Sequence, residues 1–420
     1  MAADGGHLRF VLIYKSLQHM KSGLNVVAVV FLLAVLNMVS CKKDGGGGTT
    51  PPPPSSLPVL SGADVTKTRT TTSSTMRFYL GLNKASTSPV SAKYTLVPGT
   101  ALSPKDFTAA SGTITIPANE TSAFVDVAIT GDSLRQADIV YTFQLSEPVN
   151  CSIGTTSFKG IISSADGTYL PTDNAGYTTP LSYPGYTLAW SDEFSGAAVD
   201  ASTWNFETGG GGWGNNELEN YTGRPQNVFQ SNGNLIIEAR KEDLGGSNYT
   251  SARITTYKKK EFQYGRIDIR AKLPVAKGLW PALWMLGADI ATNPWPKCGE
   301  IDNMELVGTY PKRVVGSMHW PLSNGANGTI NANYELVSED FSQQFHVFSI
   351  IWVENSIKFY VDDNLFFTGT SASITDGTYA FNHPYFFIMN VAVGGDWPGP
   401  PDASTVFPQR MFVDYIRVFQ

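Results

Sequence analysis

Short runs in which apolar and polar residues alternate recur along the chain after residue 57, and this pattern constrains the fold most. Five such runs lie between residues 57 and 166, among them MRFYLGL at 76–82 and SAFVDVAIT at 122–130. Alternation with period two places every second side chain on the same face of a strand, so the runs predict a small β-sandwich over residues 57–167. The 40 glycines and 25 prolines suit the tight turns that join such strands.

A second series of strand-like runs fills residues 183–420, among them LIIEAR at 235–240, YFFIMNVAV at 385–393 and RMFVDYIRVFQ at 410–420. These runs lack helical periodicity and predict one large sandwich of two sheets, a jelly roll with a concave face. A chain of 420 residues is too long for one ordinary core, which agrees with two folded domains. The fold class is therefore all-β.

The first 56 residues indicate a targeting signal followed by a linker. The apolar stretch 24–39 is short for a membrane span and typical of a signal peptide, although a short membrane anchor is the alternative. Ser40 before Cys41 resembles a bacterial lipoprotein processing site, which implies a signal peptide over residues 1–41, with Met20 as a candidate start, and lipidation of Cys41. We expect secretion across the inner membrane and anchoring at the outer membrane or cell surface. Residues 42–56 are rich in glycine and proline and predict a linker.

Charge and side-chain chemistry exclude several function classes. The net charge of −6 argues against nucleic acid as a partner, because that partner requires a basic surface. The three cysteines, Cys41, Cys151 and Cys298, are too far apart in the chain to imply a disulfide framework. The five histidines show no metal-ligand spacing, so we expect no cofactor for catalysis.

The segment GEIDNMEL at 299–306 carries three acids. On a strand, Glu300 and Asp302 share a face, whereas Glu305, five residues after Glu300, points to the opposite face. A β-bulge near Met304 would add one residue and return Glu305 to the first face. We therefore predict a bulged strand that presents three carboxylates on one side.

Catalysis explains such an arrangement better than stability does. Three carboxylates with no cation nearby in sequence repel one another, which raises at least one pKa. A retaining glycosidase needs a carboxylate nucleophile and a protonated acid, and Glu300 and Glu305 are the candidate pair. The shorter Asp302 would tune the nucleophile by sharing a proton. A solvent-facing strand that carries acids by chance is the alternative.

Aromatic residues in GLWPALWML at 278–286 point to the ligand. Trp280, Ala282 and Trp284 share one strand face, and two indoles around a small residue make a platform on which a sugar ring can stack. Core packing of both tryptophans is the alternative. Pro281 removes a backbone donor, which predicts a sheet edge or a bulge.

Several segments together are similar to glycoside hydrolase family 16, especially its laminarinase branch. They are WSDEF at 190–194, WGNNELENYT at 213–222, YGR at 264–266, residues 278–284, residues 299–305, HW at 319–320, AVGG at 392–395 and VDYIRV at 413–418. The resemblance implies a concanavalin-like jelly roll that cleaves β-1,3-glucan or mixed-linkage β-glucan. It also implies that Glu300 is the nucleophile, Asp302 an assisting acid and Glu305 the general acid/base. A galactan hydrolase and a transglycosylase are the enzymatic alternatives.

The binding residues follow from this resemblance and from the aromatic pattern. Candidate sugar contacts are Trp280, Trp284, Asn216, Arg224 and His319, with Trp295 and Trp397 as further candidates. The family resemblance implies a structural calcium ion held by Glu193, the Gly233 carbonyl and Asp414, because hard oxygen ligands suit calcium. For the two acids, an ordinary turn or ion pair is the alternative. We expect a monomer whose partner is a neutral polysaccharide.

The first sandwich resembles the Calx-β family in DF at 106–107, SGTITIP at 111–117, GD at 131–132 and FQLS at 143–146. Such domains can hold calcium through acids at strand ends, and Asp132, Asp138 and Asp166 are the candidate set. We interpret this domain as a spacer or binding module. Two non-enzymatic functions for the chain are a carbohydrate-binding protein and a surface adhesin, and the acidic motif at 299–306 speaks against both.

Overall fold

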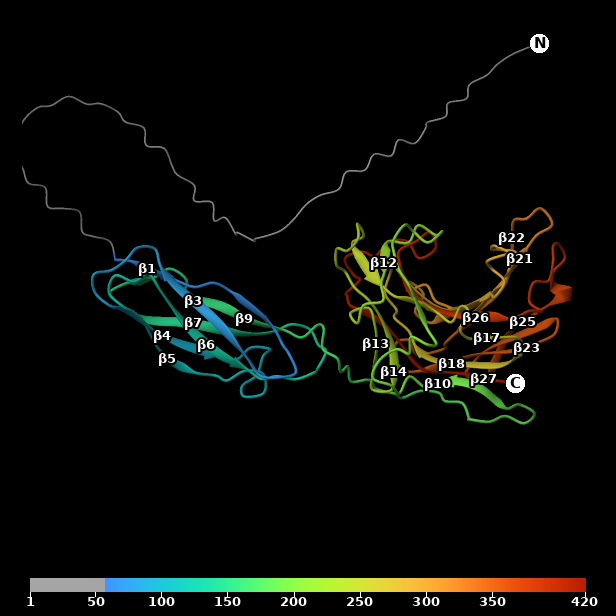
Figure 1. Ribbon diagram of the computed structural model, residues 1–420, viewed down its shortest axis with the longest axis horizontal. Helices are drawn as coiled ribbons and strands as arrows, with labels where there is room; N and C mark the ends of the chain where they lie inside the picture. The colour runs from blue at the N-terminus through green and yellow to red at the C-terminus, as the bar shows by residue number, and fades with distance from the viewer. Residues whose placement is uncertain (1–56) are drawn as a thin grey trace, which may run out of the picture. The chain divides into compact units, whose positions relative to one another are not determined.

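The computed structural model describes residues 57–420, so the predicted signal peptide (1–41), the predicted linker (42–56) and Cys41 lie outside the described residues. The described chain is built of strands, with one short helical turn, η1 (Ser371–Ser373), and the all-β expectation is confirmed (Figure 1). No helix in residues 57–420 combines the length and apolarity needed to cross a bilayer. Cys151 and Cys298 are both buried and unpaired.

Two sheets form the smaller sandwich, one in the order β6-β3-β1-β8 and the other in the order β2-β9-β7-β4-β5. The strands are β1 (Val59–Ser61), β2 (Val65–Thr68), β3 (Ser74–Leu82), β4 (Val90–Val97), β5 (Ser111–Ile116), β6 (Ser122–Ile129), β7 (Ile139–Val149), β8 (Ser152–Ile153) and β9 (Ser157–Ser163). The five alternating runs of the sequence coincide with β3 to β7. Along β3, Met76, Phe78 and Leu80 are buried while the residues between them face solvent, as period two requires.

The acids proposed as calcium ligands in this sandwich are engaged differently. Arg69 forms an ion pair with Asp132 at 2.5 Å, and Arg240 forms one with Asp166 at 2.8 Å. Each guanidinium already neutralises a carboxylate that calcium would need. The contacts of Asp132 and Asp166 therefore give no support to the hypothesis that this sandwich binds calcium.

The connection that precedes the expected start of the catalytic domain at residue 183 already contacts the larger sandwich. Leu170 is buried against Phe229 and Ile236. Farther along, Arg270 donates to the Tyr177 carbonyl at 2.6 Å. Thr179 hydrogen-bonds the hydroxyl of a tyrosine on the last strand. Side chains and backbone of this stretch therefore find partners in the larger sandwich.

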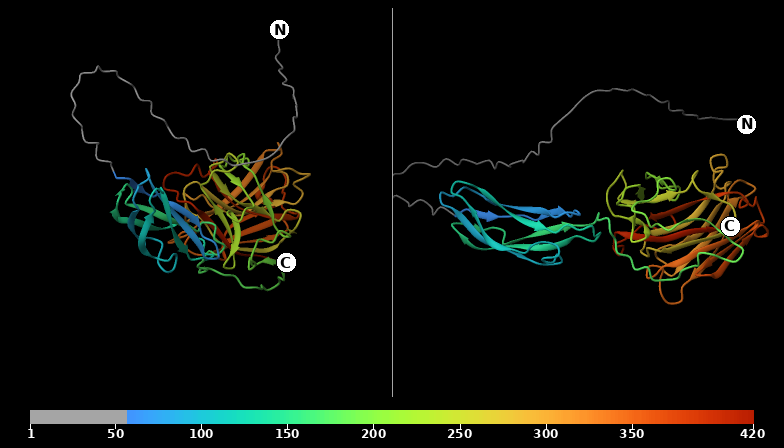
Figure 2. Two further views of the ribbon diagram at one scale, coloured as in Figure 1. Left: turned by 60° about the vertical axis from the view of Figure 1, so that its left-hand side comes forward. Right: turned by 60° about the horizontal axis from the view of Figure 1, so that its bottom comes forward.

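The larger sandwich consists of two main sheets that face each other (Figure 2). The outer sheet has the order β13-β14-β27-β18-β23-β24-β25, with β10 added beside β27. Its strands are β10 (Leu188–Asp192), β13 (Val228–Ser231), β14 (Asn234–Ala239), β18 (Gly265–Lys272), β23 (His346–Val353), β24 (Ser356–Val361), β25 (Asn364–Thr370) and β27 (Gln409–Phe419).

The second sheet, called the cleft sheet below, has the order β11-β16-β26-β19-β20-β21-β22, with β17 paired to β26. Its strands are β11 (Asn205–Glu207), β16 (Arg253–Thr255), β17 (Glu261–Phe262), β19 (Leu279–Gly287), β20 (Glu300–Glu305), β21 (Arg313–Pro321), β22 (Asn327–Glu335) and β26 (Tyr385–Val393). A short parallel pair, β12 (Glu219–Tyr221) and β15 (Tyr249–Ser251), lies apart from both sheets in the pairing order. The core lies between the two main sheets, so the other face of the cleft sheet is free for a ligand.

Of the two positions that the sequence allowed for Pro281, a sheet edge or a bulge, the strand pairing excludes the edge. Its strand, β19, pairs with β26 on one side and with β20 on the other. The pairing with β20 begins only at Ala282, one residue after the proline. The missing donor of Pro281 therefore falls where the ladder with β20 has already ended, and its carbonyl accepts from Leu306 at 3.1 Å.

Gly299 fixes how the chain enters β20, and its replacement gives a test of this fold. Its φ is +72°, and a Cβ there would lie 2.0 Å from the Tyr385 hydroxyl oxygen and 3.1 Å from the Ala380 carbonyl oxygen. The two obstacles are hydrogen-bonded to each other at 2.8 Å, so neither moves easily. We expect Gly299→Ala to lower the free energy of unfolding by roughly 3 kcal/mol, from backbone strain and overpacking together.

Gly233 is the matched control. Its φ is +74°, but a Cβ there meets nothing within 4 Å. Gly233→Ala should therefore cost only the backbone strain, about 1 kcal/mol. Urea unfolding followed by tryptophan fluorescence measures both variants, and equal losses would contradict the packing argument.

Candidate active site

Strand β20 contains the bulge that the sequence predicts. Opposite β20, Trp284 pairs with Asp302. The preceding residue of β19, Leu283, pairs with Met304. Asn303 is thus the extra residue without a partner on β19, and the register with β21 shifts over the same stretch. The prediction of a bulge near Met304 is confirmed.

The bulge brings the three acids to one side of the sheet. Glu300, Asp302 and Glu305 all line one cleft, whereas Ile301 and Met304 are fully buried in the core on the other side. On β19, the partners of Glu300 and Glu305 are four residues apart, so the two backbones lie roughly 13 Å apart at about 3.3 Å per residue. Long side chains that lean toward each other are needed to bring the carboxyl groups to one bond of a substrate.

Burial raises the pKa of all three carboxyl groups. The pKa of Glu300 rises to about 8, through desolvation and then through the charge of Asp302. The pKa of Glu305 rises to about 7, through desolvation and then through the charge of Glu300. Asp302 is 1% exposed, and burial followed by the charge of Glu305 places its pKa well above the usual value. The cluster therefore holds at least one proton at neutral pH, as general acid catalysis requires.

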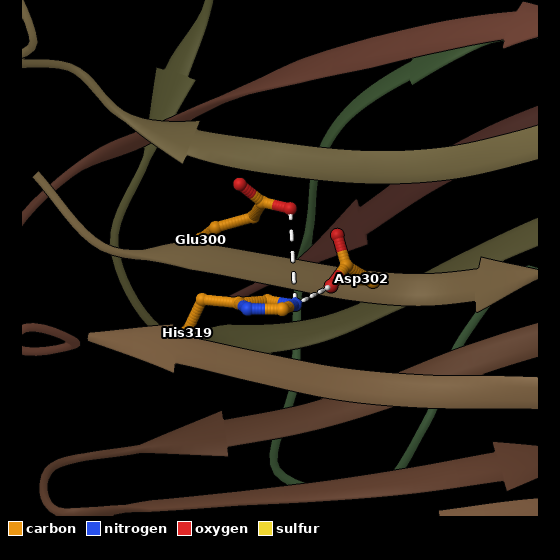
Figure 3. Close-up of side chains that lie close together, drawn as sticks. All are labelled: Glu300, Asp302 and His319. Atoms are coloured by element: carbon orange, nitrogen blue, oxygen red, sulfur yellow. Dashed lines mark ion pairs between the residues drawn. The ribbon is translucent and has the colours of Figure 1, made fainter. Parts of the chain in front are cut away.

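His319 faces these acids from the neighbouring strand (Figure 3). Its Nε2 lies 3.1 Å from Asp302 Oδ2 and 3.9 Å from Glu300 Oε1. On the other side of the ring, Nδ1 lies 3.1 Å from the Asn327 amide nitrogen and 2.9 Å from the Thr329 hydroxyl oxygen, so these two side chains fix the ring with Nε2 facing the carboxylates. The ligand atoms of Glu300, Asp302 and His319 lie within 4.8 Å of one another, close enough to hold a metal ion. Sequence spacing does not reveal this grouping, because strand pairing creates it.

Indole groups bind the acids directly. Trp280 Nε1 donates to Glu305 Oε1 at 3.1 Å, and Trp295 Nε1 donates to Glu300 Oε2 at 2.7 Å. Trp397 packs edge-on against Trp280, with ring centroids 5.4 Å apart. The two candidates whose strand phase the sequence left open therefore both lie in the cleft. Each tryptophan near an acid offers a stacking surface and a hydrogen-bond donor at once.

The cleft has a volume of about 820 Å³ and runs over the middle strands of the cleft sheet. Its lining includes Trp280, Ala282 and Trp284 of β19, as the period-two argument expects, and His319 of β21. Other lining side chains are Trp213, Asn215, Glu217, Arg253, Trp295, Val315, Ser317, Asn327, Thr329, Asn331, Asn333, Asn390, Ala392 and Trp397. Aromatic rings, amides and hydroxyls dominate this surface.

The structure keeps two predicted sugar contacts out of the cleft, Arg224 and Asn216. The guanidinium of Arg224 bonds the Glu242 carboxylate and the Asn227 side chain. Asn216 has φ +56° in a tight turn, and its amide donates to Asp396 at 2.9 Å instead. Neither residue is among the side chains that line the cleft. Loop geometry, which period-two reasoning cannot supply, decided both cases.

Sequence reasoning missed a buried network beside the cleft. The Tyr221 hydroxyl donates to Glu217 at 3.0 Å, and the same hydroxyl oxygen accepts a hydrogen bond from the Asn390 amide at 3.1 Å. The Asn390 side chain in turn accepts from the Trp284 indole at 2.8 Å. Glu219 is fully buried, and burial together with Glu217 raises its pKa well above the usual value. The i, i+2, i+4 spacing of these polar residues in ELENY was the available signal, and the network holds Trp284 in place.

Comparisons with known proteins agree with this geometry. The model of glycosyl hydrolases family 16 matches residues 215–417. The beta-glucanase of Rhodothermus marinus is 40% identical over 247 residues, which cover 56% of this chain and 86% of that protein. The chain belongs to glycosyl hydrolases family 16. The laminarinase catalytic domain of Thermotoga maritima MSB8 is a structural match with a TM-score of 0.53 and 49% identity, covering 56% of this chain and 98% of that one.

Another relative of this family 16 chain is longer. Glucan endo-1,3-beta-glucosidase A1 of Niallia circulans is 38% identical over 273 residues, 58% of this chain. The chain spans 39% of that relative's length. The family model falls entirely within the larger sandwich, which locates the family 16 domain there.

The residues expected to bind calcium in this family 16 domain are arranged as ion pairs. Arg417 donates to both carboxylate oxygens of Glu193, at 2.8 and 2.7 Å. Asp414 accepts from Arg270 at 2.8 Å, and Gly233 forms the turn between β13 and β14. Calcium would have to displace both guanidinium groups. The donor set in this arrangement does not fit a calcium site.

The raised pKa of Glu300 predicts a pH-dependent gain of stability in Glu300→Gln. A carboxyl whose pKa rises from 4.5 unfolded to about 8 folded loses stability as the pH rises through that window, because only the unfolded chain ionises freely. The amide has no such loss. We expect the Tm of Glu300→Gln to exceed that of the wild type clearly at pH 8 and little at pH 5. The difference at pH 8 should correspond to a few kcal/mol.

Glu354→Gln is the control, since Glu354 is exposed in the turn between β23 and β24. Its Tm should track the wild type at every pH. Thermal scans from pH 5 to 8 make the comparison, and a Tm difference for Glu300→Gln that does not grow with pH would refute the role of burial.

The arginine-paired acids predict that a chelator leaves stability unchanged. Because Arg417 and Arg270 already neutralise Glu193 and Asp414, EDTA should shift the Tm by less than the scatter between repeated scans. Arg417→Ala should lower the Tm without creating any dependence on added calcium. A drop of several degrees with EDTA, restored by calcium, would show that the ion takes the place of the arginines.

Proposed function

We propose that the chain is a retaining endo-β-1,3-glucanase that cleaves laminarin-type or mixed-linkage β-glucan. The observation that carries the proposal is the bulged strand β20, which presents Glu300, Asp302 and Glu305 on the floor of an aromatic cleft. Relatives described as a laminarinase, a beta-glucanase and an endo-1,3-beta-glucosidase share the family 16 domain and support this substrate class.

In the first step, Glu300 attacks the anomeric carbon while Glu305 protonates the glycosidic oxygen of the leaving chain. Trp295 donates to Glu300 and so holds its headgroup in place. Asp302, buried beside Glu300, keeps a proton that it can share with the nucleophile. The covalent glycosyl–enzyme intermediate forms with inversion at the anomeric carbon.

In the second step, the same two glutamates exchange roles. Glu305, now ionised, takes a proton from water, and the oxygen of that water displaces Glu300 from the sugar. Trp280 and Ser317, at 3.1 and 3.4 Å, place donors on the two oxygens of Glu305 and so accommodate its charge. The second inversion restores the original configuration, so the product retains the β-anomer.

The charge of the cleft favours a neutral polymer over a sulfated galactan. Four acids line it, and Arg253 is the one lysine or arginine in the lining. The Arg253 guanidinium is bonded to Glu207 and stacked between Trp213 and Trp284. No free cation is therefore left in this lining for a sulfate group, whereas uncharged sugar rings can stack on the indoles.

The proposal extends to the cellular location and to the first sandwich. The apolar stretch 24–39 followed by Ser40 and Cys41 supports a lipid-anchored enzyme at the outer membrane or cell surface. The motif SGTITIP at 111–117 in a two-sheet sandwich supports a Calx-β-like module. Both statements rest on the sequence pattern.

Digestion of laminarin tests the function and the roles of the acids. The wild type should release oligosaccharides whose new reducing ends appear first as the β-anomer in proton NMR. Glu300→Gln should lower kcat by a factor of about 10³ or more, because the amide cannot form the intermediate. Glu305→Gln should keep fast intermediate formation only with an activated aryl glycoside, since that leaving group needs no acid.

Glu354→Gln controls for loss of an exposed acid and should retain full activity. A first product in the α-configuration would contradict a retaining mechanism. Activity confined to agarose or carrageenan would contradict the β-glucan substrate. Products longer than the starting chains, dominant at high acceptor concentration, would identify a transglycosylase.

A further inference from the structure

A chain of four ordered side chains stands on the solvent-exposed face of the smaller sandwich. In the register of β3 with β6, Arg77 pairs with Asp126, and Tyr79 pairs with Phe124. The two strands run side by side in Figure 1. Tyr79 is 65% exposed and Phe124 is 50% exposed. Large aromatic side chains placed this openly on adjacent strands are costly for a domain whose core is already complete.

Contacts among the four side chains hold them in place without burying them. Arg77 donates two hydrogen bonds to Asp126, both at 2.7 Å. The Arg77 guanidinium carbon lies 3.8 Å from the centre of the Phe124 ring. That ring meets Tyr79 edge-on, with centroids 6.1 Å apart. A ligand would therefore find the groups ordered in advance and would lose little affinity to their immobilisation.

Small residues leave space beside the aromatic pair. The next pair on the same face is Gly81 with Ser122. A Cβ at Gly81 would have only the Thr121 carbonyl oxygen nearby, at 3.9 Å, so nothing overhangs this position. The rings thus border an uncovered position on the exposed face of the sheet.

We propose that Arg77, Tyr79, Phe124 and Asp126 form a second polysaccharide-binding site, termed the β3–β6 platform, which takes a neutral β-glucan chain. Its identification of β-glucan rests on the proposed function of the cleft. A sugar ring offers an apolar C–H face that stacks on an aromatic ring, and its hydroxyl groups bond the charged pair alongside. The platform supplies both kinds of contact within two adjacent ladder positions.

Charge and area favour this ligand over others. Arg77 and Asp126 neutralise each other, so the platform offers no field that would attract an anionic polymer. Two rings fall well short of the about 800 Å² per partner that a stable protein interface buries. A neutral polymer can still bind through so small a site, because it repeats the same contact along its length.

The consequence is a two-site enzyme. A platform in the same chain as the cleft keeps the enzyme near an insoluble glucan after each cut, because the second contact becomes intramolecular. This contribution should matter for solid substrate and little for short soluble chains, which cannot reach both sites.

Binding to particles of insoluble β-1,3-glucan tests the platform. The full chain carries Glu300→Gln and Trp280→Ala, so that the cleft does not cut the polymer and binds it more weakly. Depletion from solution then gives an apparent Kd. We expect Tyr79→Ala and Phe124→Ala each to raise this Kd about tenfold and their combination to leave only the residual retention of the cleft, while Tyr79→Phe keeps the parent Kd because the ring remains.

Matched controls separate binding from folding. Tyr169→Ala removes an exposed tyrosine outside the platform, and Lys93→Ala breaks an exposed ion pair with Glu147 on the other sheet. Both should leave the Kd unchanged. Thermal unfolding identifies any variant that fails to fold. In that case the Kd of Tyr79→Phe is compared with that of the parent chain.

Three outcomes would overturn the proposal that the platform binds β-glucan. Equal retention of the Tyr79→Ala and parent chains would do so, as would no retention of the parent on any of a panel of insoluble β-glucans. A concentration-dependent dimer abolished by Phe124→Ala, with no glucan retention, would assign the face to protein contact instead. If the wild type fails to cut laminarin, the cleft proposal falls alone, because retention on the particles is measured without catalysis.

Discussion

The bulge at Asn303 is the constraint on which the rest of the site depends. In a regular strand of the same sequence, without the bulge, Glu305 would project into the core between the sheets, where Met304 and Ile301 now lie fully buried. An ionised carboxylate in that position would have no partner and would cost several kcal/mol. The bulge therefore places an acid at the cleft and keeps the core apolar with one change of register.

Concentrating three acids on one strand works against the stability of the sandwich, and neighbouring groups limit the loss. Trp280 and Trp295 each donate to one glutamate, and Nε2 of His319 lies 3.1 Å from Asp302 Oδ2. These groups come from β19, from the loop before β20 and from β21, so the sheet must be complete before the acids are accommodated. The same burial that disfavours ionisation keeps a proton available for catalysis at neutral pH.

Sequence reasoning succeeded for side chains whose strand face follows from the period of two residues alone. The alternation in residues 278–286 placed Trp280 and Trp284 together, and the odd spacing in residues 299–306 required a bulge that the register confirms. It could not place Arg224 and Asn216, whose loops are set by long-range contacts outside the cleft lining, and it left an edge and a bulge open for Pro281 because it could not see β20 beside β19. The meeting of His319 with the acids was also invisible, since only the pairing of β20 with β21 creates it.

The cleft and the platform both offer an aromatic ring to a sugar, but they hold that ring in different ways. In the cleft, Trp280 is tied to Glu305 by a hydrogen bond, so its stacking surface is fixed relative to the reacting acid. On the platform, Tyr79 contacts the ring of Phe124 and the side chain of Arg77, and the one acid of the platform, Asp126, is itself held by Arg77. An aromatic surface next to a proton donor favours bond cleavage, whereas an aromatic surface next to a neutralised ion pair favours retention. The difference between a catalytic subsite and a simple anchor thus reduces to the protonation state of the carboxyl groups beside the ring.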